Sequence, residues 1–184
     1  MLLWLWILII VIIILIVILI SYFNRFAVLE NRIDNSLSQI DVQLRKRADL
    51  IPNLINSVKG YMKHEKGVIT EVTNARKALI GAKELPARVK AGDNLQSALG
   101  HLFAIAENYP NLKANENFLQ MQNELAATED KIAYSRQYYN DGIMSYNVSL
   151  TTIPGKWFAS LYSFQKKEYL QIPAEARAVP KVSF

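Results

Sequence analysis

Twenty apolar residues follow one another without interruption at the start of the chain, from Met1 to Ile20, and the first charged side chain is Arg25. At about 1.5 Å per helical residue, such a run spans a hydrocarbon core of roughly 30 Å. It lacks the basic n-region and the small-residue cleavage site of a signal peptide, and it is longer than the apolar part of one. We therefore expect residues 1–23 to form an uncleaved, single transmembrane anchor.

Aromatic side chains stand at both ends of this run. Trp4 and Trp6 lie near its beginning, Tyr22 and Phe23 directly follow it, and Arg25 comes next. Trp and Tyr rings are enriched at the two membrane–water interfaces. These five side chains are our first candidates for membrane-interface residues.

Basic residues predict the orientation of the span. No Lys or Arg precedes it, whereas Arg25, Arg32 and the basic run 45–47 follow it. The positive-inside rule then places the amino terminus outside and the rest of the chain in the cytoplasm. The absence of cysteine agrees with a reducing compartment.

The remaining residues suffice for one domain with its own core. The chain has 21 basic and 16 acidic side chains, and its net charge is +5. A mild basic excess beside a bilayer is explained by attraction to anionic headgroups, so the lipid bilayer is an expected partner. Nucleic acid is not expected, because no DNA- or RNA-binding signature accompanies the charge.

Apolar side chains recur every seven residues after the anchor, which is typical of a helix that packs on others. One register holds Ile33, Ile40, Leu54, Tyr61 and Val68, and the second holds Leu37, Leu44, Ile51 and Val58. Arg47 interrupts the first register. Pro52 lacks an N–H and crowds the preceding turn, so we expect it to kink this helix or start a new one.

Three further helices are predicted by the same period. The first covers residues 67–83, with Val68, Val72, Ala75 and Leu79 on one face, and the second begins near Pro86, with Val89, Leu95, Leu99, Leu102 and Ile105 inward. The last carries Phe118, Leu125, Ile132, Tyr139, Tyr146 and Ile153 at seven-residue spacing. We expect its polar residues 128–130 to face outward.

These patterns predict an all-α protein. Its N-terminal transmembrane helix is expected to continue into an antiparallel, long four-helix bundle, because helices with one apolar stripe and short connections pack that way. The predicted divisions are an anchor over residues 1–23, a helical bundle over 24–155, an aromatic amphipathic segment over 156–169 and an extended tail over 170–184.

The segment after the bundle mixes aromatic and basic residues, and it has two interpretations. Its candidate residues are Trp157, Phe158, Leu161, Tyr162, Phe164, Lys166 and Lys167. It resembles an interfacial amphipathic helix that binds lipid. It also fits a short cap on the open end of the bundle. We favour the cap, since aromatic side chains bury much area and usually find a core.

No residue pattern predicts catalysis. His64 and His101 lack the spacing of a helical zinc site, because Val68 stands where a second histidine would be needed, and neither histidine has a glutamate three residues before it. The sequence has no glycine-rich phosphate loop, no nucleophile elbow and no cysteine. We therefore expect no enzyme activity, no catalytic residue, no cofactor and no metal.

Arg47 is the one unusual residue of the apolar registers. It could be a buried or inter-subunit charge that pairs with Glu124 or Glu129 of the last helix. Alternatively, Ala48 takes the inward position and Arg47 extends along the surface. The second interpretation is the one we favour from the sequence.

Several blocks of the chain resemble one known family. They are residues 33–47, 49–54, 58–61, 64–65, 72–73, 75–76 and 107–114, followed by Phe118, 128–129, Ile132, Arg136, 139–140 and 146–147. The chain resembles the LemA family of bacterial membrane proteins in these blocks, from the anchor to about Lys167, and departs from it at Ser38 and in a short amino terminus. The resemblance implies one span of the bacterial inner membrane and a cytoplasmic four-helix bundle. It brings no catalytic site, cofactor or substrate.

Two functions compete on these grounds. The first is a non-enzymatic, membrane-anchored scaffold or adaptor that forms homo-oligomers or docks other membrane proteins, since heptad stripes with charged flanks are typical of helix association. The alternative is a membrane-surface sensor or remodelling protein that binds anionic lipid through residues 156–167.

Overall fold

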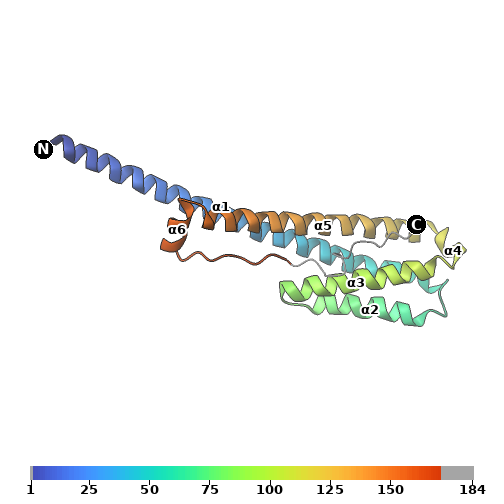
Figure 1. The fold of residues 1–184 in the computed structure, drawn as a ribbon. Helices are drawn as coiled ribbons and strands as arrows, with labels where there is room; N and C mark the ends of the chain where they lie inside the picture. Colours follow the sequence, from blue (N-terminus) through green and yellow to red (C-terminus); the bar gives the residue numbers. More distant parts are fainter. Residues whose placement is uncertain (1, 171–184) are drawn as a thin grey trace, which may run out of the picture. The chain divides into compact units, whose positions relative to one another are not determined.

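The computed structural model describes residues 2–170, and the regular structure of that range consists of six α-helices without a strand (Figure 1). The predicted all-α class is confirmed. The helices are α1 (Leu2–Lys59), α2 (Lys66–Gly81), α3 (Leu85–Ala106), α4 (Pro110–Lys113), α5 (Glu116–Thr151) and α6 (Gly155–Leu161). Most of the predicted tail, residues 171–184, lies outside the described residues.

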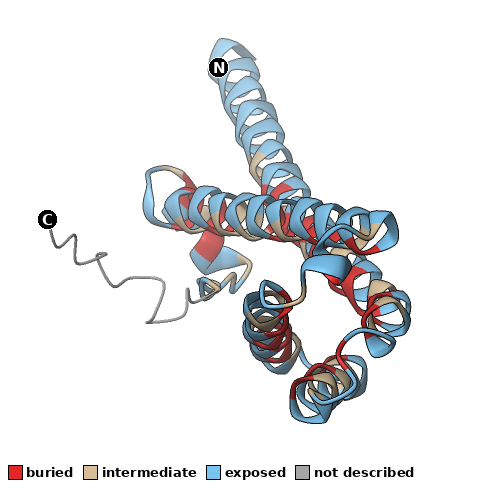
Figure 2. Cartoon of the chain, turned by 90° about the vertical axis from the view of Figure 1, so that its right-hand side faces the viewer, coloured by how far each residue is buried: buried red, intermediate tan, exposed pale blue. Residues whose placement is uncertain are grey.

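The first turns of α1 have the properties of a membrane span. Its most apolar 18-residue window has a mean hydropathy of 3.7, and none of that window is buried in the protein. Figure 2 shows these turns exposed on all sides. Nineteen apolar side chains in water would be costly, so a bilayer is the environment that suits residues 2–20.

The chain divides into two compact units. Within the described residues, unit 1 comprises residues 2–37 and 136–170, and unit 2 comprises residues 38–135. Unit 2 therefore contains the end of α1, the helices α2 to α4 and the beginning of α5. The four-helix bundle arrangement stays a prediction.

The core of unit 2 follows the predicted apolar registers. The buried residues common to both are Ile40, Leu44, Ile51, Leu54 and Val58 of α1, Val68, Val72 and Leu79 of α2, Val89, Leu95, Leu99 and Leu102 of α3, and Phe118, Leu125 and Ile132 of α5. Tyr61 is exposed, and Met62 is buried instead. The register fails there because α1 ends at Lys59 and the following turn changes the phase of the side chains.

Two other expectations from the periodicity are wrong. Thr128 is buried rather than outward, because its hydroxyl donates to the Glu124 carbonyl oxygen at 2.7 Å and so leaves no unsatisfied donor in the core. Ile153 is exposed. It lies beyond the end of α5 at Thr151, where the helical phase no longer applies.

Of the two alternatives expected at Pro52, the start of a new helix is wrong, because α1 continues through it to Lys59. A proline in a helix frees the carbonyl four residues earlier, which here belongs to Ala48. The Arg76 side chain of α2 donates from Nε to that oxygen at 2.7 Å. An arginine from a neighbouring helix thus replaces the missing backbone donor.

Replacing Arg76 with methionine should lower the free energy of unfolding by about 2 kcal/mol, the usual cost of leaving a polar group without its charged partner. In a Pro52→Ala background the cost should fall below about 1 kcal/mol, because the new N–H at position 52 satisfies Ala48. Urea unfolding of the full chain in mild detergent, followed by circular dichroism, measures both values. Equal costs in the two backgrounds would contradict this explanation.

The core of unit 1 is built from three helices. Phe26, Leu29 and Ile33 of α1 pack with Ile143, Tyr146 and Leu150 of α5 and with Ala159 of α6. Tyr22, Tyr139, Phe158 and Phe164 pack around this cluster and are partly buried. The end of the membrane span and the aromatic segment therefore belong to one packed unit.

Candidate functional site

Three aromatic pairs join α1 of unit 1 to α6 and to the segment that follows α6. Tyr22 stacks on Phe158 with ring centroids 4.9 Å apart. Phe23 lies 5.2 Å from Tyr162, and Phe26 lies 5.0 Å from Phe164. Successive aromatic residues of α1 thus each contact an aromatic residue between positions 158 and 164.

The predicted membrane-interface residues fall into two groups. Phe158, Tyr162 and Phe164 are partly buried against α1, as a cap would be. Trp157 and Leu161 are exposed, as a lipid-binding face would be. The exposed group also contains Trp4, Trp6, Phe23, Arg25 and Lys166. The aromatic segment therefore has one side packed on α1 and one exposed side.

The Lys167 side chain interacts with two side chains of unit 1. Its Nζ lies 3.2 Å from Glu30 Oε1 and 5.3 Å from the centroid of the Tyr146 ring. The Tyr146 hydroxyl donates to the same Glu30 oxygen at 3.3 Å. Burial of the phenol, the nearby Glu30 charge and this hydrogen bond raise the pKa of Tyr146 to about 12. The phenol therefore remains a hydrogen-bond donor at neutral pH.

Two asparagine side chains of α5 form hydrogen bonds with the backbone of the segment that follows α6. Asn147 Nδ2 donates to the Lys167 carbonyl at 2.9 Å, and its Oδ1 accepts from the Lys167 N–H at 3.0 Å. Asn140 makes the same two bonds with Leu170. Asn140 and Asn147 are seven helical residues apart, which is about 10.5 Å, and Lys167 and Leu170 are three extended residues apart, which is about 10 Å. The two asparagines are therefore spaced to bind both backbone positions.

Sequence reasoning did not assign a role to these asparagines. The signal was present as a Tyr-Asn pair repeated after seven residues, at 139–140 and 146–147. In each pair the tyrosine packs toward the core cluster, and the asparagine binds the backbone of the extended segment.

Arg47 lies in the interior of unit 2. Its side chain is 1% exposed, in place of the surface position that we favoured from the sequence. Nη1 donates to the Gly92 carbonyl of α3 at 3.2 Å, and Nη2 forms an ion pair with Glu129 of α5. Glu124 instead accepts a hydrogen bond from Gln120 at 3.2 Å. Ala48 is also buried.

The titratable side chains of the described residues do not converge on a reaction centre. His101 Nδ1 lies 3.0 Å from Glu71 Oε2, but both side chains are exposed, and so is His64. Within residues 2–170, no group of three His, Cys, Asp or Glu side chains could hold a metal ion.

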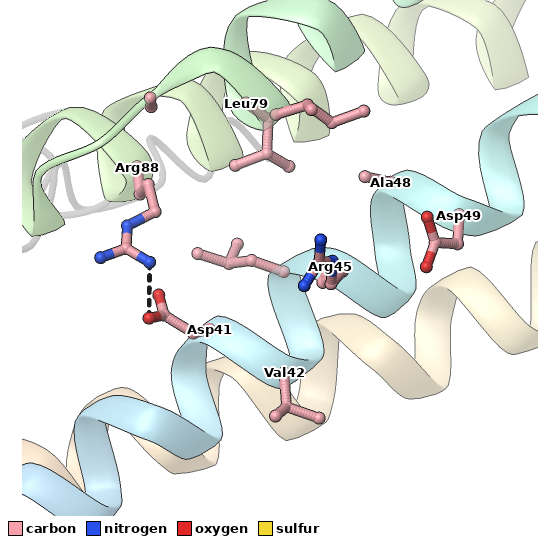
Figure 3. A pocket seen from close by; sticks show the side chains of 10 residues that line it. Asp41, Val42, Arg45, Ala48, Asp49, Leu79 and Arg88 are labelled. Carbon is pink, nitrogen blue, oxygen red and sulfur yellow. Dashed lines mark hydrogen bonds and ion pairs between the residues drawn. The ribbon is translucent and has the colours of Figure 1, made fainter.

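An open groove crosses the surface of unit 2 between α1 and the end of α2 (Figure 3). We call it the α1–α2 groove. Its volume is about 410 Å³, and it is lined by Asp41, Val42, Leu44, Arg45, Ala48, Asp49, Leu79, Ile80, Ala82 and Arg88. The residues from α1 follow the i, i+3, i+4, i+7 spacing of one helix face. One face of α1 thus forms a side of the groove.

The edge of the groove combines exposed apolar side chains with both signs of charge. Val42 is 62% exposed and Ile80 is 58% exposed. Arg88 donates from Nη1 to Asp41 Oδ2 at 2.5 Å, which fixes one end (Figure 3). Arg45 and Asp49 are exposed.

Residues 36–184 match the LemA family. The chain belongs to the LemA family. The resemblance inferred from the sequence blocks is thereby confirmed. Family membership and the apolar helix α1 together support a membrane location for this LemA-family chain.

Curated relatives of this LemA-family chain include magnetosome proteins. Magnetosome protein MamQ of Magnetospirillum gryphiswaldense is 24% identical over 82% of this chain, and MamQ 2 of Paramagnetospirillum magneticum is 23% identical over 83%. Protein LemA of Metamycoplasma hominis is 29% identical over 67% of it. The matches span 65%, 66% and 57% of those relatives' own lengths.

Proposed function

We propose that this LemA-family chain is a non-enzymatic, membrane-anchored scaffold that self-associates through its helical body. The apolar turns of α1 hold it in the bacterial inner membrane, with the amino terminus outside and unit 2 in the cytoplasm. Arg25 and Arg32, which follow the span, support this orientation. The helices of unit 2 provide the surface for association.

The observation that carries this proposal is the α1–α2 groove. Val42 and Ile80 are exposed apolar residues of the groove lining, and Leu44 and Leu79 are its buried apolar residues. Exposed apolar surface is favourable to bury against another helix. The groove is partly open to the surface. It therefore accommodates a second protein surface better than a small molecule.

Charge complementarity favours a second copy of this chain as the occupant. A two-fold contact places the same surface on both sides, so each charge needs an opposite charge within its own patch. Arg45 and Asp49 provide this pattern, one helical turn apart and both exposed. Arg45 of one copy would then face Asp49 of the other, and the reverse pair would form by symmetry.

The test is energy transfer between donor- and acceptor-labelled full-length chains in proteoliposomes. The chain has no cysteine, so Lys131→Cys gives one labelling position on an exposed side chain. We expect transfer that persists on dilution with lipid. The double variant Val42→Lys/Ile80→Lys should reduce it to the level of randomly distributed monomers. Leu119→Lys, an exposed apolar position outside the groove, should leave it unchanged.

Charge reversal tests the proposed two-fold contact. Arg45→Glu alone and Asp49→Arg alone should each lower the transfer, because like charges then meet across the contact. The combined variant should restore it. Full transfer in the Val42→Lys/Ile80→Lys variant, or no recovery in the combined charge variant, would contradict association through this groove.

A sensor or remodeller of the membrane surface is the second candidate function. The exposure of Trp157 and Leu161 beside the membrane span favours it. If this function holds, Trp157→Ser/Leu161→Ser should abolish any change in vesicle shape caused by the chain and leave its energy transfer intact.

A further inference from the structure

An apolar row follows one face of α6. Ile153, Trp157 and Leu161 are spaced four residues apart and are 70%, 65% and 64% exposed. Residues four apart on a helix lie above one another on the same side. Ile153 lies two residues before the first residue of α6 and is exposed, so the helical spacing places only Trp157 and Leu161 on one face. We call these three side chains the α6 row.

The contacts of α6 determine which way the α6 row points. Phe158 stacks on Tyr22, Ala159 is buried in the core of unit 1, and Tyr162 contacts Phe23. These side chains hold the opposite side of α6 against α1. The α6 row therefore cannot turn toward the core without loss of the aromatic pairs.

The length of the apolar run gives the depth of α6 relative to a bilayer. Twenty helical residues cover about 30 Å, the full hydrocarbon thickness, so residues just after Ile20 lie at the lipid–water boundary. Tyr22 and Phe23 are those residues, and their partners on α6 have ring centroids only 4.9 and 5.2 Å away. The α6 row thus lies at the depth where lipid headgroups meet acyl chains.

Exposed basic side chains accompany the α6 row. Lys156 lies in the first turn of α6, Lys166 follows the helix, and Arg25 follows the span. Lys167 is excluded from this set because its ammonium group is bound to Glu30. Exposed cations beside an apolar face are the combination that binds an anionic membrane surface.

We propose that Ile153, Trp157 and Leu161 insert into the interface of the leaflet that faces unit 1, while Lys156 and Lys166 contact anionic headgroups. This lipid contact is the membrane-binding step of the second candidate function. It rests on that function only for its biological role. The lipid contact itself does not require self-association or membrane remodelling.

Fluorescence of Trp157 tests the contact. The sequence has three tryptophans, so Trp4→Phe/Trp6→Phe leaves Trp157 as the only one. The full chain is reconstituted in vesicles of phosphatidylcholine and phosphatidylglycerol, with lipids brominated near the headgroup end of their acyl chains. We expect strong quenching by these lipids and weak quenching by acrylamide in the water. Full acrylamide quenching without bromolipid quenching would overturn the proposal.

The control places the only tryptophan elsewhere in unit 1. Met144 is exposed on α5, two residues from Gly142, and a Cβ added to Gly142 would lie 3.3 Å from Ile33 Cγ1 of α1. Ile33 lies thirteen residues past Ile20, which is about 20 Å of helix. Met144→Trp with the other three tryptophans replaced by phenylalanine should therefore be quenched by acrylamide and spared by bromolipid.

Lipid composition tests the electrostatic half of the proposal. Bromolipid quenching of Trp157 should increase with the phosphatidylglycerol content and decrease with added salt. Lys156→Gln/Lys166→Gln should remove both dependences. Quenching independent of phosphatidylglycerol would overturn the headgroup contact. Protection of Trp157 from both quenchers would overturn lipid insertion in favour of a protein contact, such as a second copy. Vesicle imaging separately reports whether the second candidate function holds.

Discussion

Replacement of Gly155 by alanine should destabilise the chain by about 3 kcal/mol, near the upper end of the cost of overpacking a tight site. Gly155 begins α6 and is buried where α5 turns into it. A Cβ there would overlap the Ser149 carbonyl oxygen and lie 3.7 Å from Phe26 Cζ. A backbone atom cannot move aside as a flexible side chain could, so the start of α6 must shift away from the end of α5.

The loss should appear first in unit 1. In Gly155→Ala with Trp4→Phe/Trp6→Phe, the fluorescence of Trp157 should change at a lower urea concentration than the circular dichroism of the whole chain. Gly100→Ala is the matched control, because nothing lies within 4 Å of its added Cβ in α3. That change should be neutral or stabilise the chain by up to about 1 kcal/mol. A Gly155→Ala chain with unchanged unfolding would contradict the close packing of this corner.

Loss of the Glu129 carboxylate should cost about 3 kcal/mol, because it removes one partner of a buried ion pair with Arg47. Arg47 is 1% exposed, whereas Glu129 is 36% exposed, so the arginine carries most of the burial penalty. Arg47→Met should therefore cost clearly less than Glu129→Leu, since it leaves a carboxylate that water still reaches. The double variant should recover much of the loss and lie within about 1 kcal/mol of the original chain.

Urea unfolding of the full chain and its three variants measures this cycle. Glu71→Gln serves as the control for a surface pair, because Glu71 and its partner His101 are both exposed. That change should alter stability by less than about 0.5 kcal/mol. A purely additive cycle for Arg47 and Glu129 would contradict the interpretation of a coupled buried pair.

The helical period of the sequence predicted most of the core. Phe118, Leu125 and Ile132 were assigned inward from seven-residue spacing, and all three are buried in α5. Such local repeats are visible in a sequence because one helix face meets one core. The register failed at Tyr61 and Ile153, where the helix had already ended. Helix ends depend on local turns that periodicity does not report.

The sequence alone did not predict contacts between residues of different helices. The sequence predicts a kink or a new helix at Pro52, because no neighbouring residue offers a hydrogen-bond donor in place of its missing N–H. Arg76 of another helix supplies that donor to the Ala48 carbonyl oxygen at 2.7 Å. Arg47 reads as a surface residue for the same reason, because its partners Gly92 and Glu129 lie 45 and more positions away. Both cases depend on which helices become neighbours.

The candidate sites were predicted in part. The aromatic segment was recognised from its composition, but only the structure separates Phe158 and Tyr162, which contact α1, from exposed Trp157 and Leu161. The α1–α2 groove was not predicted at all. It joins a face of α1 to the end of α2, and no short sequence pattern marks such a meeting of two elements.

The mass of the full-length chain in lipid nanodiscs tests self-association most directly. One chain has a mass of 21.0 kDa. The scaffold account predicts a discrete particle with a whole-number multiple of that protein mass, retained when the sample is diluted and reduced to one chain by Val42→Lys/Ile80→Lys. A particle that contains a single chain at every concentration would contradict the account.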